Sequence, residues 1–166
     1  MRRPLIAGNW KLYKSLAEAR AFVEELKPLI VDCKDVDVVI APVFTAISAV
    51  ASVAAESEIK VAAQDCFWES EGAFTGEVSP KLLKDAGSSH VIIGHSERRQ
   101  YFAETDETVN LKTKAALSEG LVVLLCVGET LNERESDATL RIIEKQVVGG
   151  LRGISASDLP NLVIAY

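Results

Sequence analysis

The chain has 166 residues, of which 48% are hydrophobic and 25% are charged, a composition typical of one soluble globular domain with a sizeable core. Its net charge of -6 and the lack of a Lys/Arg cluster argue against nucleic acid and against anionic membrane surfaces as partners. No apolar run approaches the roughly 20 residues of a membrane span, and residues 1–10 lack the apolar run of a signal peptide.

Continuous apolar runs predict six strands that are buried on both faces, as in a parallel sheet. In chain order these runs are residues 4–10, 36–42, 59–65, 90–96, 121–128 and 162–166. A capping box at Ser15 and Glu18 opens a helix after the first run, and this helix continues to about Leu29. Four more helices are predicted over 46–55, from Ser79-Pro80 to Gly87, from Thr105 or Asp106 to Gly120, and over 137–148 before Gly149-Gly150.

This alternation of strands and helices predicts a parallel α/β sheet, either a barrel or a doubly wound sheet. The pattern alone does not choose between the two. The first strand is not followed by G-x-G-x-x-G and the chain has no Walker A motif, so dinucleotide-binding and P-loop functions lose support. No linker or low-complexity segment divides the chain, and we predict one domain over residues 1–166.

Polar residues follow the predicted strands, at the end where α/β barrels carry their active sites. Asn9 and Lys11 are two residues apart and would share one face of the first strand. A buried Lys11 needs an anionic partner, and the simpler alternative is a lysine at the rim in an ordinary salt bridge. His95 ends the fourth strand, and Ser96 after it is a good helix cap.

A histidine at a helix N-terminus stays neutral, and a neutral imidazole can donate a hydrogen bond to a carbonyl oxygen that gains charge. The alternative for His95 is a core histidine with satisfied hydrogen bonds, as we predict for His90. The charged residues 97–99 are typical of a solvated turn, although Glu77 is a possible partner for one of the arginines. Residues 66–78 form an unusually long loop with an apolar tip, and such loops are usually functional or interfaces.

The order and spacing of these segments resemble the triosephosphate isomerase family. The matching motifs are Gly8-Asn9-Trp10-Lys11, Ala63-Gln64, Gly72-Ala73-Phe74-Thr75-Gly76-Glu77, Ile92-Ile93-Gly94-His95-Ser96-Glu97-Arg98-Arg99 and Cys126-Val127-Gly128-Glu129. The resemblance covers the whole chain. It implies a (β/α)8 barrel and an aldose–ketose isomerase of glycolysis and gluconeogenesis, which interconverts dihydroxyacetone phosphate and D-glyceraldehyde 3-phosphate by proton transfer through an enediolate.

The resemblance also implies roles for individual residues. Asn9 and Lys11 bind the phosphorylated triose, and Lys11 supplies positive charge. His95 is the neutral catalytic electrophile, and Glu97 is a supporting catalytic carboxylate. Thr75 lies at the tip of a loop that enters the partner subunit of a homodimer. No metal and no cofactor are implied. A cytoplasmic location is expected, because three widely spaced cysteines suggest neither a zinc site nor a disulfide framework.

In the family the chain continues after Ile-Ala-Tyr with Glu-Pro-Val-Trp, and that Glu is the catalytic base, whereas this sequence ends at Tyr166. A (β/α)8 barrel needs typically about 250 residues. We therefore expect an unclosed barrel of six parallel strands and five helices, in which side chains of the barrel interior face water on the open side. The chain as given should be inactive and poorly stable alone.

The alternative is a non-catalytic barrel fragment that acts by association with a complementing piece or with itself. A different phosphate-sugar barrel enzyme is disfavoured by the Gly-His-Ser-Glu-Arg-Arg block.

Overall fold

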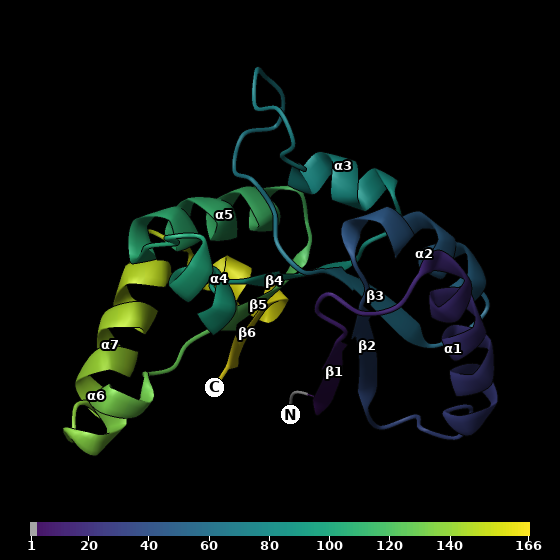
Figure 1. Cartoon of the computed structure of the whole chain (residues 1–166), viewed down its shortest axis with the longest axis horizontal. Coiled ribbons are helices and arrows are strands. Elements are labelled where there is room, and N and C mark those ends of the chain that lie inside the picture. Colours follow the sequence, from purple (N-terminus) through teal and green to yellow (C-terminus); the bar gives the residue numbers. More distant parts are fainter. Residues whose placement is uncertain (1–2) are drawn as a thin grey trace.

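The computed structural model describes residues 3–166, in which six parallel strands form a curved, unclosed sheet (Figure 1). The strands are β1 (Leu5–Asn9), β2 (Asp37–Ala41), β3 (Ile59–Ala63), β4 (His90–Ile93), β5 (Val122–Cys126) and β6 (Leu162–Ala165). They pair in sequential order from β1 to β6, and every pair is parallel. The six predicted strands and the incomplete barrel are confirmed, and a doubly wound sheet, whose strand order reverses, is excluded. Met1 and Arg2, which begin the predicted domain, lie outside the described residues.

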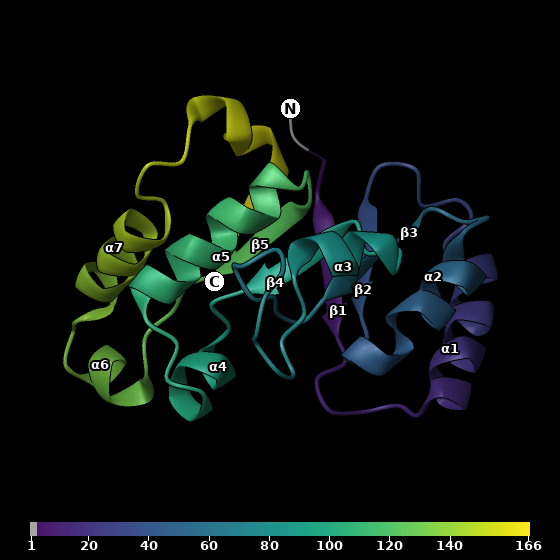
Figure 2. The same cartoon turned by 90° about the horizontal axis from the view of Figure 1, so that it is seen from above.

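Seven α-helices and two 3-10 helices connect the strands in the described part of the chain. They are α1 (Leu16–Leu29), η1 (Phe44–Ala46), α2 (Ile47–Ala54), α3 (Pro80–Asp85), α4 (Ser96–Tyr101), α5 (Asp106–Ser118), α6 (Leu131–Glu135), α7 (Thr139–Gly150) and η2 (Ala156–Asn161). Figure 2 shows α1 and α2 near β2 and β3, and α5 and α7 on the side of β4 and β5. None of these helices is long and apolar enough to cross a membrane.

The prediction of five helices was too low, because α4 and α6 are too short to show the apolar period of a helix. They contain 6 and 5 residues and bury none of them. The five predicted helices are present, and their starts follow from capping. Ser15 and Glu18 form the predicted capping box of α1, Ser79 caps α3, and Thr105 caps α5.

The end of α7 differs from the prediction that two glycines close this helix. Gly149 and Gly150 lie inside α7. A Cβ atom on Gly149 would lie 2.8 Å from Cβ of Asp106, and one on Gly150 would lie 3.3 Å from the Leu125 side chain. These glycines therefore allow close packing of α7 against α5 and β5, and they do not end the helix.

Apolar residues fill both faces of the sheet. The larger core lies between the sheet and the helices. A smaller core on the concave face contains Val39, Ala62, Ile92 and Leu124, each at most 4% exposed. The interior side chains of the central strands are buried, because the twisted sheet curls until they meet. Water reaches the interior face at the open edge, where Ala7, which pairs with Val39, is exposed.

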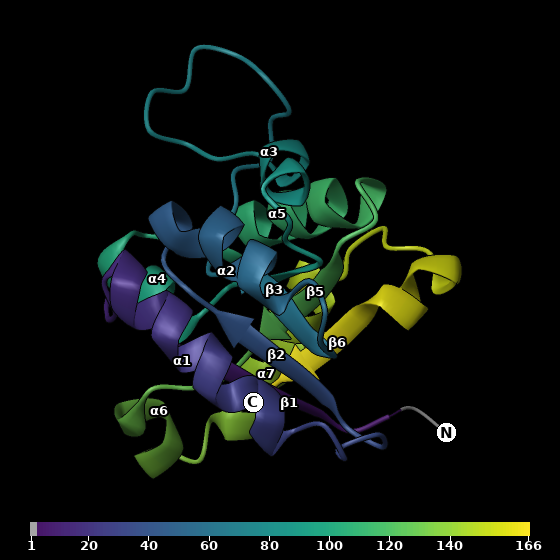
Figure 3. The same cartoon turned by 90° about the vertical axis from the view of Figure 1, so that its right-hand side faces the viewer.

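The loop over residues 66–78, here called the arm loop, projects away from the sheet (Figures 1 and 3). Residues 69–77 are exposed. The arm loop is held by its own contacts, because the Phe67 amide donates to the Val78 carbonyl at 2.9 Å and the Phe67 and Phe74 ring centroids are 4.7 Å apart. Thr75 lies in a turn closed by a hydrogen bond from the Glu77 amide to the Phe74 carbonyl.

Candidate active site

Asn9, Lys11 and His95 meet in one cavity at the carboxyl ends of the strands, which confirms their predicted placement. The cavity has a volume of about 760 Å³. Asn9 is the last residue of β1, and His95 follows the end of β4. The cavity is also lined by Leu12, Tyr13, Gln64, Glu97, Arg98, Tyr101 and Phe102. Thr75 is not among these residues and lies on the arm loop.

Lys11 reaches the cavity for a different reason from the one predicted. It is not on the strand, which ends at Asn9, but in the turn that follows, with φ of 54°. This left-handed backbone costs a residue with a side chain about 1–2 kcal/mol. Two side chains hold it in place: the Lys11 amide donates to Oδ1 of Asn9 at 2.9 Å, and Nε2 of Gln64 donates to the Lys11 carbonyl at 2.9 Å. Gln64 also donates to the carbonyl of Ala41, which ties the turn to β2.

The Lys11 ammonium group forms an ion pair with Glu97 inside this cavity. Nζ of Lys11 lies 2.7 Å from Oε1 of Glu97, and the two side chains are 48% and 42% exposed. This hydrogen bond raises the pKa of Lys11 and lowers the pKa of Glu97, so both groups are charged at neutral pH. Lys11 therefore does form the salt bridge that the simpler alternative predicted. Its partner, Glu97, is itself a predicted site residue.

The His95 ring is oriented by the first turn of α4. Its Nδ1 accepts a hydrogen bond from the Glu97 amide at 3.2 Å, so His95 is the N-cap of α4 and Ser96, the predicted cap, is its first residue. Because an acceptor nitrogen carries no proton, the neutral ring has its proton on Nε2. The Oε2 atom of Glu97 lies farther from Nδ1, at 3.5 Å. His95 is only partly buried, with a side-chain exposure of 22%.

His90, at the opposite end of β4, is buried as predicted. Its Nδ1 lies 2.8 Å from the Ser89 hydroxyl oxygen. Burial lowers the pKa of His90 to about 4, so this ring is neutral at physiological pH.

The prediction that the arginines after Glu97 belong to a solvated turn is wrong, because both form ion pairs. Nε of Arg98 lies 2.8 Å from Asp65 and 2.5 Å from Glu104. Arg99 pairs with Asp106 at 2.7 Å and donates to the Gly94 carbonyl at 3.1 Å. Within the described residues Glu77 forms no ion pair with either arginine of its own chain.

A buried cluster of four charges lies behind the cavity and was not found from the sequence. Lys112 donates to both carboxylate oxygens of Asp65, at 2.8 and 3.0 Å, and also contacts Glu104. Arg98 is the fourth member. Burial raises the pKa of Asp65 to about 6, although Lys112 opposes this shift. Lys112 lies 47 residues from Asp65 and 8 residues from Glu104 in the sequence. No local pattern indicates contacts over such separations.

A second cavity, of about 550 Å³, shares His95 with the first and is also lined by Gly128, Glu129 and Tyr166. The Glu129 carboxylate accepts hydrogen bonds from Arg134 at 2.8 Å and from the Tyr166 hydroxyl at 3.2 Å. The bond from Arg134 is the main reason that the pKa of Glu129 is lowered to about 2. Glu129 therefore stays ionised and unavailable for proton uptake at neutral pH.

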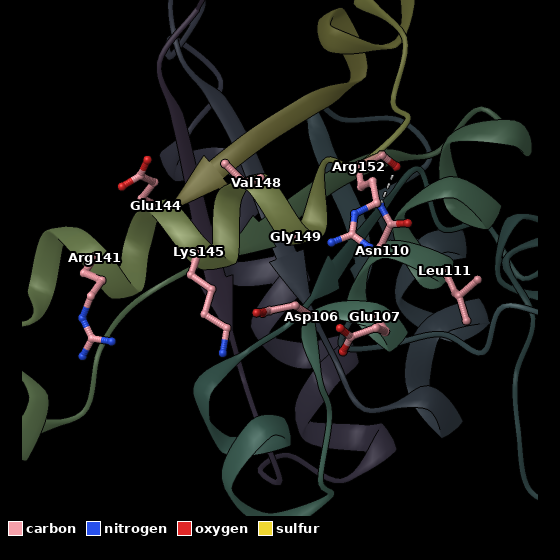
Figure 4. Close-up of a pocket in the computed structure, with 10 residues that line it drawn as sticks. All are labelled: Asp106, Glu107, Asn110, Leu111, Arg141, Glu144, Lys145, Val148, Gly149 and Arg152. Atoms are coloured by element: carbon pink, nitrogen blue, oxygen red, sulfur yellow. Dashed lines mark hydrogen bonds between the residues drawn. The ribbon is translucent and has the colours of Figure 1, made fainter.

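A third cavity lies between α5 and α7, away from the predicted site (Figure 4). Its volume is about 590 Å³, and charged residues from both helices line it. In Figure 4 the Lys145 side chain of α7 extends towards Asp106 of α5, and Arg141 lies farther along α7. It contains none of the predicted site residues.

The fold and the site first define the class of protein: a parallel α/β barrel protein, of which this chain forms an open part. Polar groups at or just after the carboxyl ends of β1, β3 and β4 converge in one cavity. The family model described as triosephosphate isomerase matches residues 4–166. The chain belongs to the triosephosphate isomerase family.

Individual relatives agree with this assignment. The chain is 69% identical over 166 residues to triosephosphate isomerase of Trichlorobacter lovleyi and 61% identical to that of Geobacter metallireducens, and it covers 66% of each. It is also similar to the crystal structure of triosephosphate isomerase from Bartonella henselae, with a TM-score of 0.92 and 38% identity, over 99% of this chain and 68% of that one. The chain thus spans about two thirds of the length of the curated relatives it matches.

Proposed function

We propose that the protein is a triosephosphate isomerase that interconverts dihydroxyacetone phosphate and D-glyceraldehyde 3-phosphate by proton transfer through an enediolate. The observation that carries this proposal is the convergence of Asn9, Lys11 and His95 in one cavity. Removing a proton next to a carbonyl group creates an oxyanion, and positioned donors and a cation lower the barrier to its formation.

Each residue contributes one part of that stabilisation. The Nε2–H group of His95 is free of the bond that occupies Nδ1, so it donates to the substrate oxygen that gains charge. The Lys11 ammonium group supplies positive charge, and Asn9 both holds the Lys11 turn and lines the cavity. Glu97 holds Lys11 through its carboxylate and His95 through its amide, so it fixes the two groups relative to each other.

The 166-residue chain should not catalyse the reaction alone. In the cavity the carboxylate of Glu97 is engaged by Lys11, and its lowered pKa makes it a weak base. The resemblance places the catalytic base after Tyr166. We therefore test the proposal in a fusion protein, which joins residues 1–166 to the remaining C-terminal part of the Trichlorobacter lovleyi relative.

In this fusion protein Lys11→Met should lower kcat/KM for the isomerase reaction by about 10² or more, because one oxyanion-stabilising group is lost. Lys14→Met is the matched control, since Lys14 stacks on Trp10 and Phe22 and does not line the cavity. Its activity should stay within about threefold of the unmodified protein. A folded fusion protein without isomerase activity, or equal losses in the two variants, would contradict the proposal.

We also propose that the protein is a cytoplasmic homodimer in which the arm loop, with Thr75, enters the partner subunit. Large apolar side chains at the rim of the cavity support this, because Leu12, Tyr13 and Phe102 are 93%, 74% and 63% exposed. The arm loop projects away from the sheet (Figure 3), and an ion pair between Glu71 and Lys81 of α3 ties it to its own chain. Shortening residues 70–76 in the fusion protein should produce a monomer in analytical ultracentrifugation, and an unchanged dimer would refute the role of the arm loop.

A further inference from the structure

The backbone just beyond β5 is held by one side chain from a helix. Both backbone groups of Gly128 bond to Gln146 of α7: the Gly128 amide donates to Oε1 at 2.8 Å, and Nε2 donates to the Gly128 carbonyl at 2.9 Å. A primary amide offers this donor and acceptor side by side. The pair resembles the two-bond exchange of a hydrogen-bonded residue pair in an antiparallel ladder. Gln146 thus takes the place of a strand partner where the ladder of β5 has ended.

Glu129 directly follows Gly128, which Gln146 clamps, and its buried carboxylate lines the second cavity. The Glu129 side chain is 2% exposed, and its Oε1 accepts from Arg134 at 2.8 Å, from Thr139 at 3.2 Å and from the Tyr166 hydroxyl at 3.2 Å. Three donors from separate elements converge on one oxygen. A small displacement of the Gly128 backbone would therefore disturb all three hydrogen bonds, because the carboxylate moves with its own main chain.

Gly128, Glu129 and Tyr166 form a wall of the second cavity, and His95, the predicted electrophile, lines the same cavity of about 550 Å³. We propose that Gln146 is a positioning residue for the isomerase reaction: it fixes Gly128 and, through Glu129 and Tyr166, the wall of the cavity beside His95. The inference rests on the proposed function, but the position of Glu129 and Tyr166 can be measured without any activity.

A purely structural role for Gln146 predicts a different outcome, and the chain offers a matched control for it. Asn110 of α5 also clamps the backbone through a side-chain amide, because its Nδ2 donates to the Gly150 carbonyl at 2.9 Å and the Arg152 carbonyl at 3.0 Å. Asn110 is 8% exposed and lines neither of the two cavities that contain His95. Asn110→Ala should therefore lower stability without altering catalysis.

The experiment compares Gln146→Leu, Gln146→Glu and Asn110→Ala in the fusion protein. Gln146→Leu should lower kcat about 10- to 100-fold, since misplacement by about 1 Å can cost 10²-fold, with KM changed less than about threefold. In Gln146→Glu a carboxylate oxygen still accepts from the Gly128 amide, but the ionised carboxylate has no proton to donate to the Gly128 carbonyl and repels it. Protonation of the carboxylate supplies an O–H donor for this carbonyl again. The kcat of Gln146→Glu relative to the unmodified protein should therefore rise from pH 8 to pH 5, whereas the ratio for Gln146→Leu should stay constant.

A folded Gln146→Leu protein with unchanged kcat, or Gln146→Glu without recovery at low pH, would overturn the inference. If Gln146→Leu does not fold, the pH profile of Gln146→Glu carries the test. If the unmodified fusion protein lacks isomerase activity, the proposed function fails, and a crystal structure of Gln146→Glu at pH 8 judges the positioning role. Oε1 of Glu129 and the Tyr166 hydroxyl should then lie beyond hydrogen-bond distance, about 3.5 Å, and an intact bond between them would overturn the inference.

Discussion

Replacing Lys112 by methionine removes a cation from the buried cluster of four charges behind the site. The side chains of Lys112 and of its partners Asp65 and Glu104 are only 5–6% exposed. With Arg98 the cluster contains two positive and two negative charges, so it is balanced. Without Lys112, two buried carboxylates share one guanidinium group, and one negative charge is left without compensation.

The size of the effect follows from this burial. Removing one partner of a buried ion pair typically costs about 3–5 kcal/mol, because the remaining charge stays buried and unpaired. The free energy of unfolding of a typical domain is about 5–15 kcal/mol, so Lys112→Met should remove a large part of the stability at pH 8.

The loss should depend on pH. Burial raises the pKa of Asp65 to about 6, and Lys112 opposes this rise, so the pKa of Asp65 should rise further in the variant. A carboxylate whose pKa is higher in the folded than in the unfolded state binds a proton preferentially in the folded state. Its protonation therefore stabilises the fold as the pH falls through the folded pKa. The destabilisation by Lys112→Met should be smaller at pH 5 than at pH 8.

The assay is urea unfolding of the fusion protein at fixed protein concentration, followed by circular dichroism at both pH values. Lys114→Met is the matched control, because Lys114 is exposed on the same helix and should change stability by no more than about 0.5 kcal/mol. Asp65→Asn combined with Lys112→Met restores the charge balance and should recover part of the loss. A loss below about 1 kcal/mol at pH 8, or the same loss at both pH values, would refute the reasoning.

Three further predictions concern the site, the packing and the sheet edges. In the fusion protein His95→Gln should lower kcat by about 10²–10⁴, and a change below about tenfold would argue against its role. Gly149→Ala should cost about 1–3 kcal/mol in urea unfolding, because its methyl group would meet Asp106, and an unchanged midpoint would contradict that contact. The 166-residue chain should form oligomers in light scattering, because β1 and β6 each pair with one strand and Ile6 and Ile164 are 65% and 44% exposed. Placing lysine at both positions should reduce this association, and a monomer with a sharp thermal transition before any substitution would contradict it.

The strands and the long helices were predictable because their signals are local. A buried parallel strand is a continuous apolar run, and a helix start such as Ser15 with Glu18 is a capping box, so both can be identified within a few residues. The short helix α6 also has such a box at Thr130 and Glu133. The signal for α6 was present, but its five residues show no apolar period.

The site was only partly predictable, because its geometry depends on contacts between distant segments. The positions of Asn9, Lys11 and His95 followed from strand ends and from the family resemblance. The turn that carries Lys11 depends on Gln64, which is 53 residues away, and the clamp of Gln146 on Gly128 spans 18 residues. No periodicity or local motif contains these pairings.

The most direct test of the proposed function is an isomerase assay of the 166-residue chain beside the fusion protein, and beside the same chain mixed with the separate C-terminal part of the Trichlorobacter lovleyi relative. The fusion protein should convert dihydroxyacetone phosphate, and the mixture should recover measurable activity. The 166-residue chain alone should be slower by at least the factor of about 10²–10⁴ that a general base supplies. Near-normal turnover by residues 1–166 alone would contradict the assignment of the base beyond Tyr166, and a folded fusion protein without activity would contradict the isomerase function itself.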